Sequence, residues 1–207
     1  MTQITTIVLA SGSKFRQEIL RSTGLEFDVK TSKVDESKIV EKTGQDMALA
    51  RANAKALAVA TGLEGTLVIG ADQTLSLDDK IFDKAQSREE AEARLNEFSG
   101  KIHHLHSAVV LYLADSGETK KIGEFCVNVS MTMKTLSALT VSNYLDTNEW
   151  KGCVGCYQAE NKGSLLFEKV GGNNTSVIGL PICELSGLLE DHGIFILDNS
   201  FGPWELK

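Results

Sequence analysis

The sequence predicts an α/β fold built on a mixed β-sheet. Apolar strand segments alternate with helical segments in the first half of the chain, which is typical of α/β units. Strand segments then follow one another directly, which favours antiparallel pairs in the same sheet. Hydrophobic residues make up 42% and charged residues 24% of the 207 residues, as in globular proteins, and the two prolines form no linker. We therefore expect one domain spanning residues 1–207.

The first three predicted elements are a strand, a helix and a strand. The apolar, β-branched run from Ile4 to Ala10 predicts a buried strand. A helix is expected from Lys14 to about Thr23, with Ser13 as its N-cap and Gly24 after its last turn. A second strand is expected from Glu26 to Thr31.

A longer helix and a hairpin come next. The helix is expected from Gln45 to Ala60, with an apolar stripe made of Met47, Ala50, Ala54, Leu57 and Ala58. The apolar run from Leu67 to Ala71 predicts another buried strand. A small hairpin is expected from Thr74 to Phe82, turning at Asp78 and Asp79.

The second half of the chain is richer in strands. A helix is expected to start at Ser87, where Glu90 completes a capping-box pattern. The segments from His104 to Leu113 and from Lys121 to Met133 predict a long antiparallel pair. Three shorter elements are expected after it: a helix from Ser137 to Leu145, a strand from Leu165 to Val170, and a helix that Pro181 opens near Cys183 and that ends at Glu190. The tail, from about residue 195 to 207, is expected to be loosely attached.

Charge and hydropathy exclude several classes of function. The net charge is −7, whereas proteins that bind nucleic acid or anionic lipid generically carry a basic excess. The apolar runs are too short to span a membrane, and the N-terminus does not resemble a signal peptide. We expect a cytoplasmic protein without a nucleic-acid or membrane partner.

Two clusters suggest metal or redox chemistry, but a structural role explains each better. Cys153 and Cys156 form a lone CxxC, which favours two small, half-buried residues over a zinc or redox site. In an alternating strand, His104 and His106 share one face while His103 points to the other. Without a neighbouring carboxylate at ligand spacing, ordinary strand histidines are favoured.

Polar residues at strand ends indicate phosphate chemistry. Ser11, Ser13 and Arg16 follow the first strand at a helix start, where backbone N–H groups favour a phosphate, although helix capping explains Ser13 equally well. Asp72 ends a buried strand and could hold a divalent metal or accept a proton from water; the alternative is an Asx turn. Asp35 and Glu36 form an acidic pair whose usual role is a solvated turn.

Two lysines complete this pattern. Lys55 lies beside the apolar stripe of the long helix, and Lys84 follows the small hairpin. With Arg16 they would offer three cations to phosphate oxygens, while Glu36 and Asp72 would offer carboxylates to a bridging metal. The residues therefore indicate a phosphate-processing enzyme without specifying which one.

Six motifs in this order resemble those of the Maf family of nucleotide pyrophosphatases. The family's SxSPRR is similar to Ser11–Arg16, its DE to Asp35-Glu36, and its LAxxKA to Arg51–Ala56. Its GADTV with a following KP is similar to Gly70–Thr74 with Lys84-Ala85. Its LSGxxHxV is similar to Phe98–Leu105, and its GLP to Gly179–Pro181. The resemblance implies a Maf/ITPase-like fold with an elongated mixed β-sheet flanked by helices, and a homodimer.

The resemblance also implies an activity and a set of roles. A nucleoside triphosphate would be hydrolysed between its α and β phosphates, with Mg²⁺ or Mn²⁺ required. Asp72 would be the proton acceptor and, with Glu36, a metal ligand. The phosphates would be held by Ser11, Ser13, Arg16, Lys55 and Lys84.

Three positions distinguish branches within the family. Members that act on dTTP and UTP have arginine, threonine and glutamine where this chain has Phe15, Gln73 and Glu160. The chain instead resembles the 7-methyl-GTP branch, whose Cys-x-Gly segment is also similar to residues 153–155. A cationic methylated guanine would stack on Phe15 and pair with Glu160.

Three departures and three rival functions accompany this interpretation. Lys14 and Ala85 replace family prolines, which lowers loop rigidity, and Arg51 replaces a leucine. The rivals are a pyrophosphatase for canonical dTTP and UTP, a nucleotide-binding septation regulator with little turnover, and a CxxC redox module. The chain keeps the four charged residues Glu36, Asp72, Lys55 and Lys84. They favour catalysis over the regulator, because binding alone needs no base.

Overall fold

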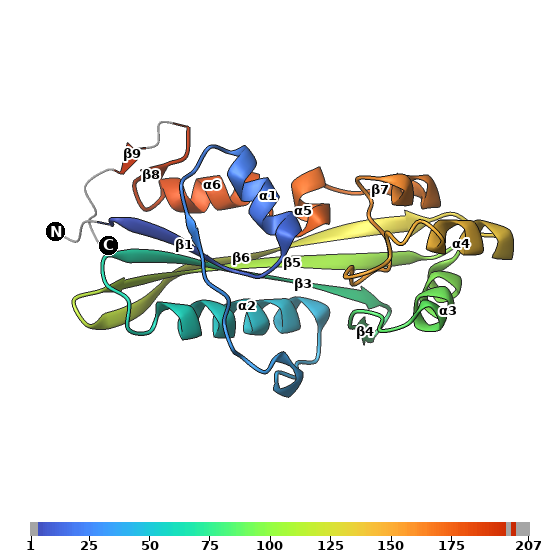
Figure 1. Cartoon of the computed structure of the whole chain (residues 1–207), viewed down its shortest axis with the longest axis horizontal. Coiled ribbons are helices and arrows are strands. Elements are labelled where there is room, and N and C mark those ends of the chain that lie inside the picture. The colour runs from blue at the N-terminus through green and yellow to red at the C-terminus, as the bar shows by residue number, and fades with distance from the viewer. Residues whose placement is uncertain (1–3, 198–199, 202–207) are drawn as a thin grey trace.

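Seven strands form one mixed sheet along the long axis of the chain (Figure 1). The structure is a computed structural model and describes residues 4–197 and 200–201. The strands run in the order β2 (Asp28–Val29), β1 (Thr6–Ala10), β3 (Thr66–Leu77), β5 (Ile102–Asp115), β6 (Glu118–Met133) and β7 (Phe167–Val170), and β4 (Lys80–Phe82) pairs with β3. The predicted fold class, an elongated mixed sheet flanked by helices, is therefore confirmed.

The sheet is mixed because its two halves are connected differently. β1 pairs in parallel with β2 and β3, and every later pair in the sheet is antiparallel. The predicted long pair is the β5–β6 hairpin, which turns at Ser116 and Gly117. The predicted small hairpin is confirmed as β3–β4, with Asp78 in the left-handed region. The second predicted strand is only two residues long, as β2.

Helix α2 (Gly44–Ala60) covers one face of the sheet (Figure 1). Its predicted stripe was wrong, because Leu57 and Ala58 are exposed and Ala50 and Ala54 only partly buried. The buried face consists of Met47, Ala48, Ala52, Ala56, Val59 and Ala60. Alanines occur all around this helix, so hydropathy alone could not identify the buried face.

Close approach to β3 determines which face of α2 is buried. Gly70 lies under the helix, and a Cβ at that position would stand 2.5 Å from the Ala52 carbonyl oxygen and 2.6 Å from the Ala56 Cβ. Only a small-residue face can pack against a bare backbone at this distance. The same face carries Lys55, whose side chain is buried.

Helices α1 (Lys14–Ser22), α5 (Asn174–Ile178) and α6 (Ile182–Glu190) lie on the opposite face of the sheet (Figure 1). The three predicted helices that begin near Lys14, Gln45 and Pro181 are confirmed, whereas α5 was not predicted. Its five residues are mostly polar or β-branched and show no helical periodicity. Leu20, Leu180 and Leu185 pack here against Leu9 and Ile69 of the sheet.

A further core lies at the far end of the sheet. There α3 (Arg88–Phe98) and α4 (Ala138–Leu145) pack beside β7 and the segment that carries η2 (Lys162–Leu166), as Figure 1 shows. Ser87 caps α3 by accepting a hydrogen bond from the Glu90 amide, as the capping pattern predicted. The predicted helix and strand in this region are confirmed as α4 and β7.

The predicted tail lies partly outside the described residues. Ile196 at its start is buried, and β8 (Ile194–Phe195) pairs with β9 (Ser200–Phe201) in a separate two-stranded sheet. Residues 198–199 and 202–207 are not described. Across residues 4–197 and 200–201, no helix combines the length and apolar character that crossing a membrane requires.

Candidate active site

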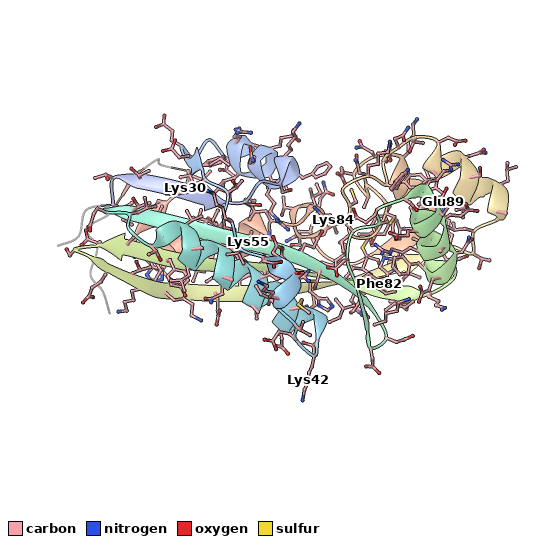
Figure 2. The ribbon with its side chains drawn as sticks, turned by 60° about the horizontal axis from the view of Figure 1, so that its bottom comes forward. Lys30, Lys42, Lys55, Phe82, Lys84 and Glu89 are labelled. Carbon is pink, nitrogen blue, oxygen red and sulfur yellow. The ribbon has the colours of Figure 1, made fainter. Side chains whose placement is uncertain are left out.

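A cavity of about 580 Å³ opens where the chain leaves β1 and β2 and passes the middle of β3. It is lined by α2 and by the β1–α1, β2–α2 and β4–α3 connections. Figure 2 shows Lys55 and Lys84 near the centre of the molecule, carried by separate elements. The cavity gathers every predicted phosphate or metal residue: Ser11, Ser13, Arg16, Glu36, Lys55, Asp72 and Lys84.

The β1–α1 connection folds into a hydroxyl-rich turn. Ser13 is the N-cap of α1, and its Oγ accepts a hydrogen bond from the Arg16 amide at 3.5 Å. The Ser11 Oγ accepts from the Ser13 amide at 3.3 Å and from Arg16 Nη1 at 3.2 Å. Capping therefore holds Ser13 in place within the cavity lining, so its structural and functional interpretations are compatible.

Two hydrogen bonds hold the side chain of Arg16, one to Ser11 and one to Gly179. Its Nε donates to the Gly179 carbonyl at 2.9 Å, which ties α1 to the end of α5. Burial lowers the pKa of Arg16, whereas the nearby charges of Asp72 and Glu36 raise it. A guanidinium held in this way presents its remaining N–H donors to an anion in the cavity.

Lys55 forms a buried pair with Asp72. The Lys55 Nζ lies 2.5 Å from Asp72 Oδ1, and both side chains are 9% exposed. The same Nζ lies 3.6 Å from Glu36 Oε2, which is more exposed. The other carboxylate oxygen, Asp72 Oδ2, is buried without a hydrogen-bond partner among the described residues. A buried, unpaired carboxylate oxygen is costly unless a ligand completes it.

The residues present fit a divalent cation shared with a phosphate ligand. Asp72 Oδ2 has no hydrogen-bond partner among the described residues, and Glu36 Oε2 lies 3.6 Å from the Lys55 Nζ that pairs with Asp72. The described part of the chain contains no cluster of three or more His, Cys, Asp or Glu arranged for a metal. Mg²⁺ commonly takes one or two carboxylates and completes its shell with water and phosphate oxygens, so two carboxylates suffice here.

Asp35 has a different role from its neighbour Glu36. Its Oδ1 accepts from the Ser37 amide at 3.2 Å and from the Ser37 hydroxyl at 2.6 Å, which caps η1 (Glu36–Lys38). These bonds lower the pKa of Asp35. The acidic pair therefore divides into a capping residue and a residue that lines the cavity.

A smaller pocket of about 80 Å³ adjoins the cavity. The two share Ser13, Arg16, Gln73, Lys84 and Val154. The smaller pocket brings together the three predicted specificity residues, Phe15, Gln73 and Glu160, which come from three distant parts of the chain.

Asp72 and Gln73 are consecutive on β3 and therefore point to opposite faces of the sheet. Asp72 meets Lys55 on the α2 side, whereas the Gln73 amide donates to the Ser107 Oγ and the Val177 carbonyl, both at 2.9 Å. These bonds use the amide nitrogen of Gln73 and leave its Oε1 available to a ligand.

Arginines that sequence reasoning did not assign to the site also contribute. Arg51 lines the cavity, and its Nη1 lies 2.9 Å from Asp83 Oδ1. Arg94 donates to the Asp83 carbonyl and, at 2.9 Å, to the Val154 carbonyl, so it joins two segments that line the site. The available signal for Arg51 was its place four residues before Lys55, one helical turn away.

The cysteine and histidine clusters are placed as the sequence indicated. His103 is buried and hydrogen-bonded to the Tyr157 hydroxyl at 2.6 Å, while His104 and His106 lie on the other face of β5. Cys153 and Cys156 are free thiols, half-buried and buried respectively. Burial, together with the nearby charge of Glu160, raises the pKa of Cys153 to about 12, so this thiol is a poor nucleophile near neutral pH.

Comparison with known proteins identifies the family. Residues 6–192 match the family described as Maf-like protein. The chain belongs to the Maf family. The "7-methyl-GTP pyrophosphatase" of Brucella suis biovar 1 (strain 1330) is 40% identical over 187 residues, which cover 86% of this chain and 92% of that protein.

The chain is also similar to a second curated protein and to a solved structure. The "Nucleoside triphosphate pyrophosphatase" of Maricaulis maris (strain MCS10) is 35% identical over 197 residues, covering 92% of this chain and 98% of that protein. Among solved structures, a HAM1 protein from Coxiella burnetii aligns with a TM-score of 0.44 and 13% identity. That alignment covers 90% of this chain and 98% of the other.

Proposed function

We propose that this Maf family member hydrolyses a nucleoside triphosphate to a nucleoside monophosphate and pyrophosphate. The observation that carries the proposal is the buried Lys55–Asp72 pair, whose second carboxylate oxygen has no hydrogen-bond partner among the described residues, beside a cavity that Asp72 lines with Arg16 and Lys84. Relatives named nucleoside triphosphate pyrophosphatase and 7-methyl-GTP pyrophosphatase support the same reaction. A protein that only binds nucleotides would not need an unpaired buried carboxylate oxygen.

In the proposed mechanism, Asp72 acts as general base. Its Oδ2 accepts a proton from the water that attacks the α-phosphorus, while the bond from that phosphorus to the oxygen bridging to the β-phosphate breaks. Lys55 donates a hydrogen bond to Oδ1 of Asp72 and so fixes the orientation of its carboxylate. A divalent cation such as Mg²⁺ or Mn²⁺, held by Asp72 and Glu36, would supply further charge neutralisation when bound.

The remaining polar residues position the phosphates. The Ser11 and Ser13 hydroxyls, the start of α1 and the Arg16 guanidinium provide donors on one side of the cavity. Lys84 faces them from the β4–α3 connection. Because the transition state distributes negative charge over several oxygens, fixed donors around them supply much of the rate acceleration.

We propose 7-methyl-GTP as the substrate that the smaller pocket fits best. Phe15 offers a ring to stack on the base, and Glu160 offers a carboxylate to a purine that carries positive charge after methylation. A neutral pyrimidine would gain less binding energy from stacking on Phe15 or from the charge of Glu160. The name of the Brucella suis relative, 7-methyl-GTP pyrophosphatase, supports this choice.

The decisive experiment measures pyrophosphate release from 7-methyl-GTP, GTP, dTTP, UTP and CTP with Mg²⁺ or Mn²⁺. We expect 7-methyl-GTP to be hydrolysed fastest. Asp72→Asn should lower kcat by about 10²–10⁴, the range for loss of a general base. Preferential turnover of dTTP or UTP would contradict the substrate assignment alone. Binding without turnover of any nucleotide would contradict the enzymatic proposal.

We also propose that the enzyme acts in the cytoplasm as a homodimer and takes free nucleotides rather than nucleic acid. The net charge of −7 supports the last point, because a long polyanion would be repelled outside the cationic cavity. Sedimentation equilibrium at micromolar concentration would test the dimer, and a monomer at these concentrations would contradict it.

A further inference from the structure

Arg51 is a partly buried cation that, among the described residues, pairs with a carboxylate through one of its side-chain nitrogens. Its side chain is 13% exposed, whereas that of its partner Asp83 is 76% exposed. Only Nη1 pairs with Asp83, at 2.9 Å, and Nε is buried without a hydrogen-bond partner in the described parts of the chain. A guanidinium has five N–H donors, so this arrangement leaves Arg51 able to bind a second anion.

The position of Arg51 indicates which part of a nucleotide it would contact. Arg51 and Lys55 lie one turn apart on α2, and both line the large cavity but not the smaller pocket. Ser13, Arg16 and Lys84 line both. With the base in the smaller pocket, the triphosphate would run from the shared residues past Asp72, and its β and γ phosphates would lie deeper in the large cavity, on the side of Arg51.

We propose that Arg51 binds the β and γ phosphates of the substrate and hence the pyrophosphate product, with Asp83 as its positioning partner. This inference rests on the proposed function. Arg51 stands where the resembled family motif has leucine. A planar fork of donors suits two neighbouring phosphate oxygens better than the single ammonium of lysine.

A purely structural role for Arg51 makes a different prediction. The Arg51–Asp83 pair ties α2 to the residue before Lys84, so its whole role could be to anchor the β4–α3 connection. In that case, removing either partner would have the same effect. If Arg51 instead contacts phosphate, its loss should be far more damaging than the loss of Asp83.

The test measures inorganic pyrophosphate binding by calorimetry in the presence of Mg²⁺, beside steady-state kinetics. Arg51→Gln should weaken pyrophosphate binding by about 10- to 100-fold and raise KM for the triphosphate, whereas binding of the nucleoside monophosphate should change by less than about threefold. Asp83→Asn should change pyrophosphate binding by less than about fivefold. The control Arg21→Gln, an exposed residue on α1, should have no effect.

Several outcomes would overturn the inference. Equal losses in Arg51→Gln and Asp83→Asn would assign Arg51 to loop anchoring, and unchanged pyrophosphate binding in Arg51→Gln would exclude contact. Pyrophosphate that fails to bind the wild-type chain would exclude it as well. By contrast, wild-type protein that releases no pyrophosphate from any nucleotide would refute the proposed function, whereas unchanged binding in Arg51→Gln would leave it intact.

Discussion

The fold keeps the Lys55–Asp72 ion pair away from water. Both are under a tenth exposed, and their 2.5 Å contact compensates each charge for part of its lost hydration. Glu36 contributes a second, weaker attraction to the same ammonium. Removing one partner would therefore leave an uncompensated charge, whereas removing both would leave a small apolar gap.

Single and double substitutions of Lys55 and Asp72 distinguish the effect of the pair on stability from its effect on catalysis. Lys55→Met should destabilise the protein by about 3–5 kcal/mol, because the buried Asp72 carboxylate loses the group that pairs with it. Adding Asp72→Leu should recover most of that loss in urea denaturation while pyrophosphate release stays absent. If the double variant were no more stable than Lys55→Met, the pair would not be the source of the loss.

His103 links stability to pH. Burial, together with the nearby charge of His104, lowers its pKa to about 3. The unfolded chain, with a histidine pKa of about 6.5, therefore binds this proton more tightly than the native state. Stability is highest above pH 6.5 and should fall between pH 6.5 and about 3 by up to about 1.4 kcal/mol per unit.

Comparison of variants isolates this contribution. The pH dependence of the urea midpoint should be shallower in His103→Gln than in the wild type, because glutamine does not titrate. His104→Gln, at an exposed position on the same strand, should keep the wild-type slope. The same slope in all three proteins would show that His103 does not control acid sensitivity.

At the scale of elements, the packing of α2 on β3 determines how deeply Lys55 enters the site. Gly70 on β3 lets the helix backbone approach, and Ala52 and Ala56 supply the small side chains that this distance requires. Lys55 sits between these alanines in the sequence, so any outward movement of α2 would also draw Lys55 away from Asp72.

Gly70→Ala should therefore impair both stability and activity. The added methyl would stand 2.5 Å from the Ala52 carbonyl oxygen, which should cost about 1–3 kcal/mol as overpacking and lower kcat by displacing Lys55. The matched control is Gly187→Ala in α6, where a Cβ meets nothing within 4 Å and should be neutral or stabilising. Full activity in Gly70→Ala would show that Lys55 does not depend on this contact.

The sequence predicted the elements better than their faces. The order of strands and helices followed from hydrophobic runs and capping residues such as Ser13 and Ser87, because those signals are local. The buried face of α2 did not, because Gly70, which selects it, lies on another element. The cavity residues were predicted from strand ends and family motifs. Arginine is common in helices, so the sequence could not single out Arg51, whose ion pair with Asp83 is seen only in the structure.

At the scale of the whole molecule, the cavity and its adjoining pocket join segments that are far apart in the chain. Residues of α1, α2 and β3 line the site together with Glu160 from the segment before η2. Arg94 of α3 adds a hydrogen bond to Val154, which lines both spaces. A ligand that fills both would connect the helices around the centre with those at the far end of the sheet.

Nucleotide binding should therefore stabilise the whole chain. A substrate analogue with a methylene group between the α and β phosphates, at 100 times its Kd with Mg²⁺, should add about 2.7 kcal/mol to the free energy of unfolding. Thermal unfolding across a concentration series would measure this increase. Arg16→Gln should require much more analogue for the same shift, and an identical curve would contradict the assignment of Arg16 to the phosphates.

The consecutive placement of Asp72 and Gln73 also limits how this enzyme can diverge. Because neighbouring strand residues face opposite ways, inserting or deleting one residue in β3 would exchange the residue facing Lys55 with the one facing the smaller pocket. Either change would remove the proposed base and the selectivity together. New substrate preferences are therefore accessible through point substitutions at Phe15, Gln73 or Glu160, while the length of β3 has to be inherited unchanged.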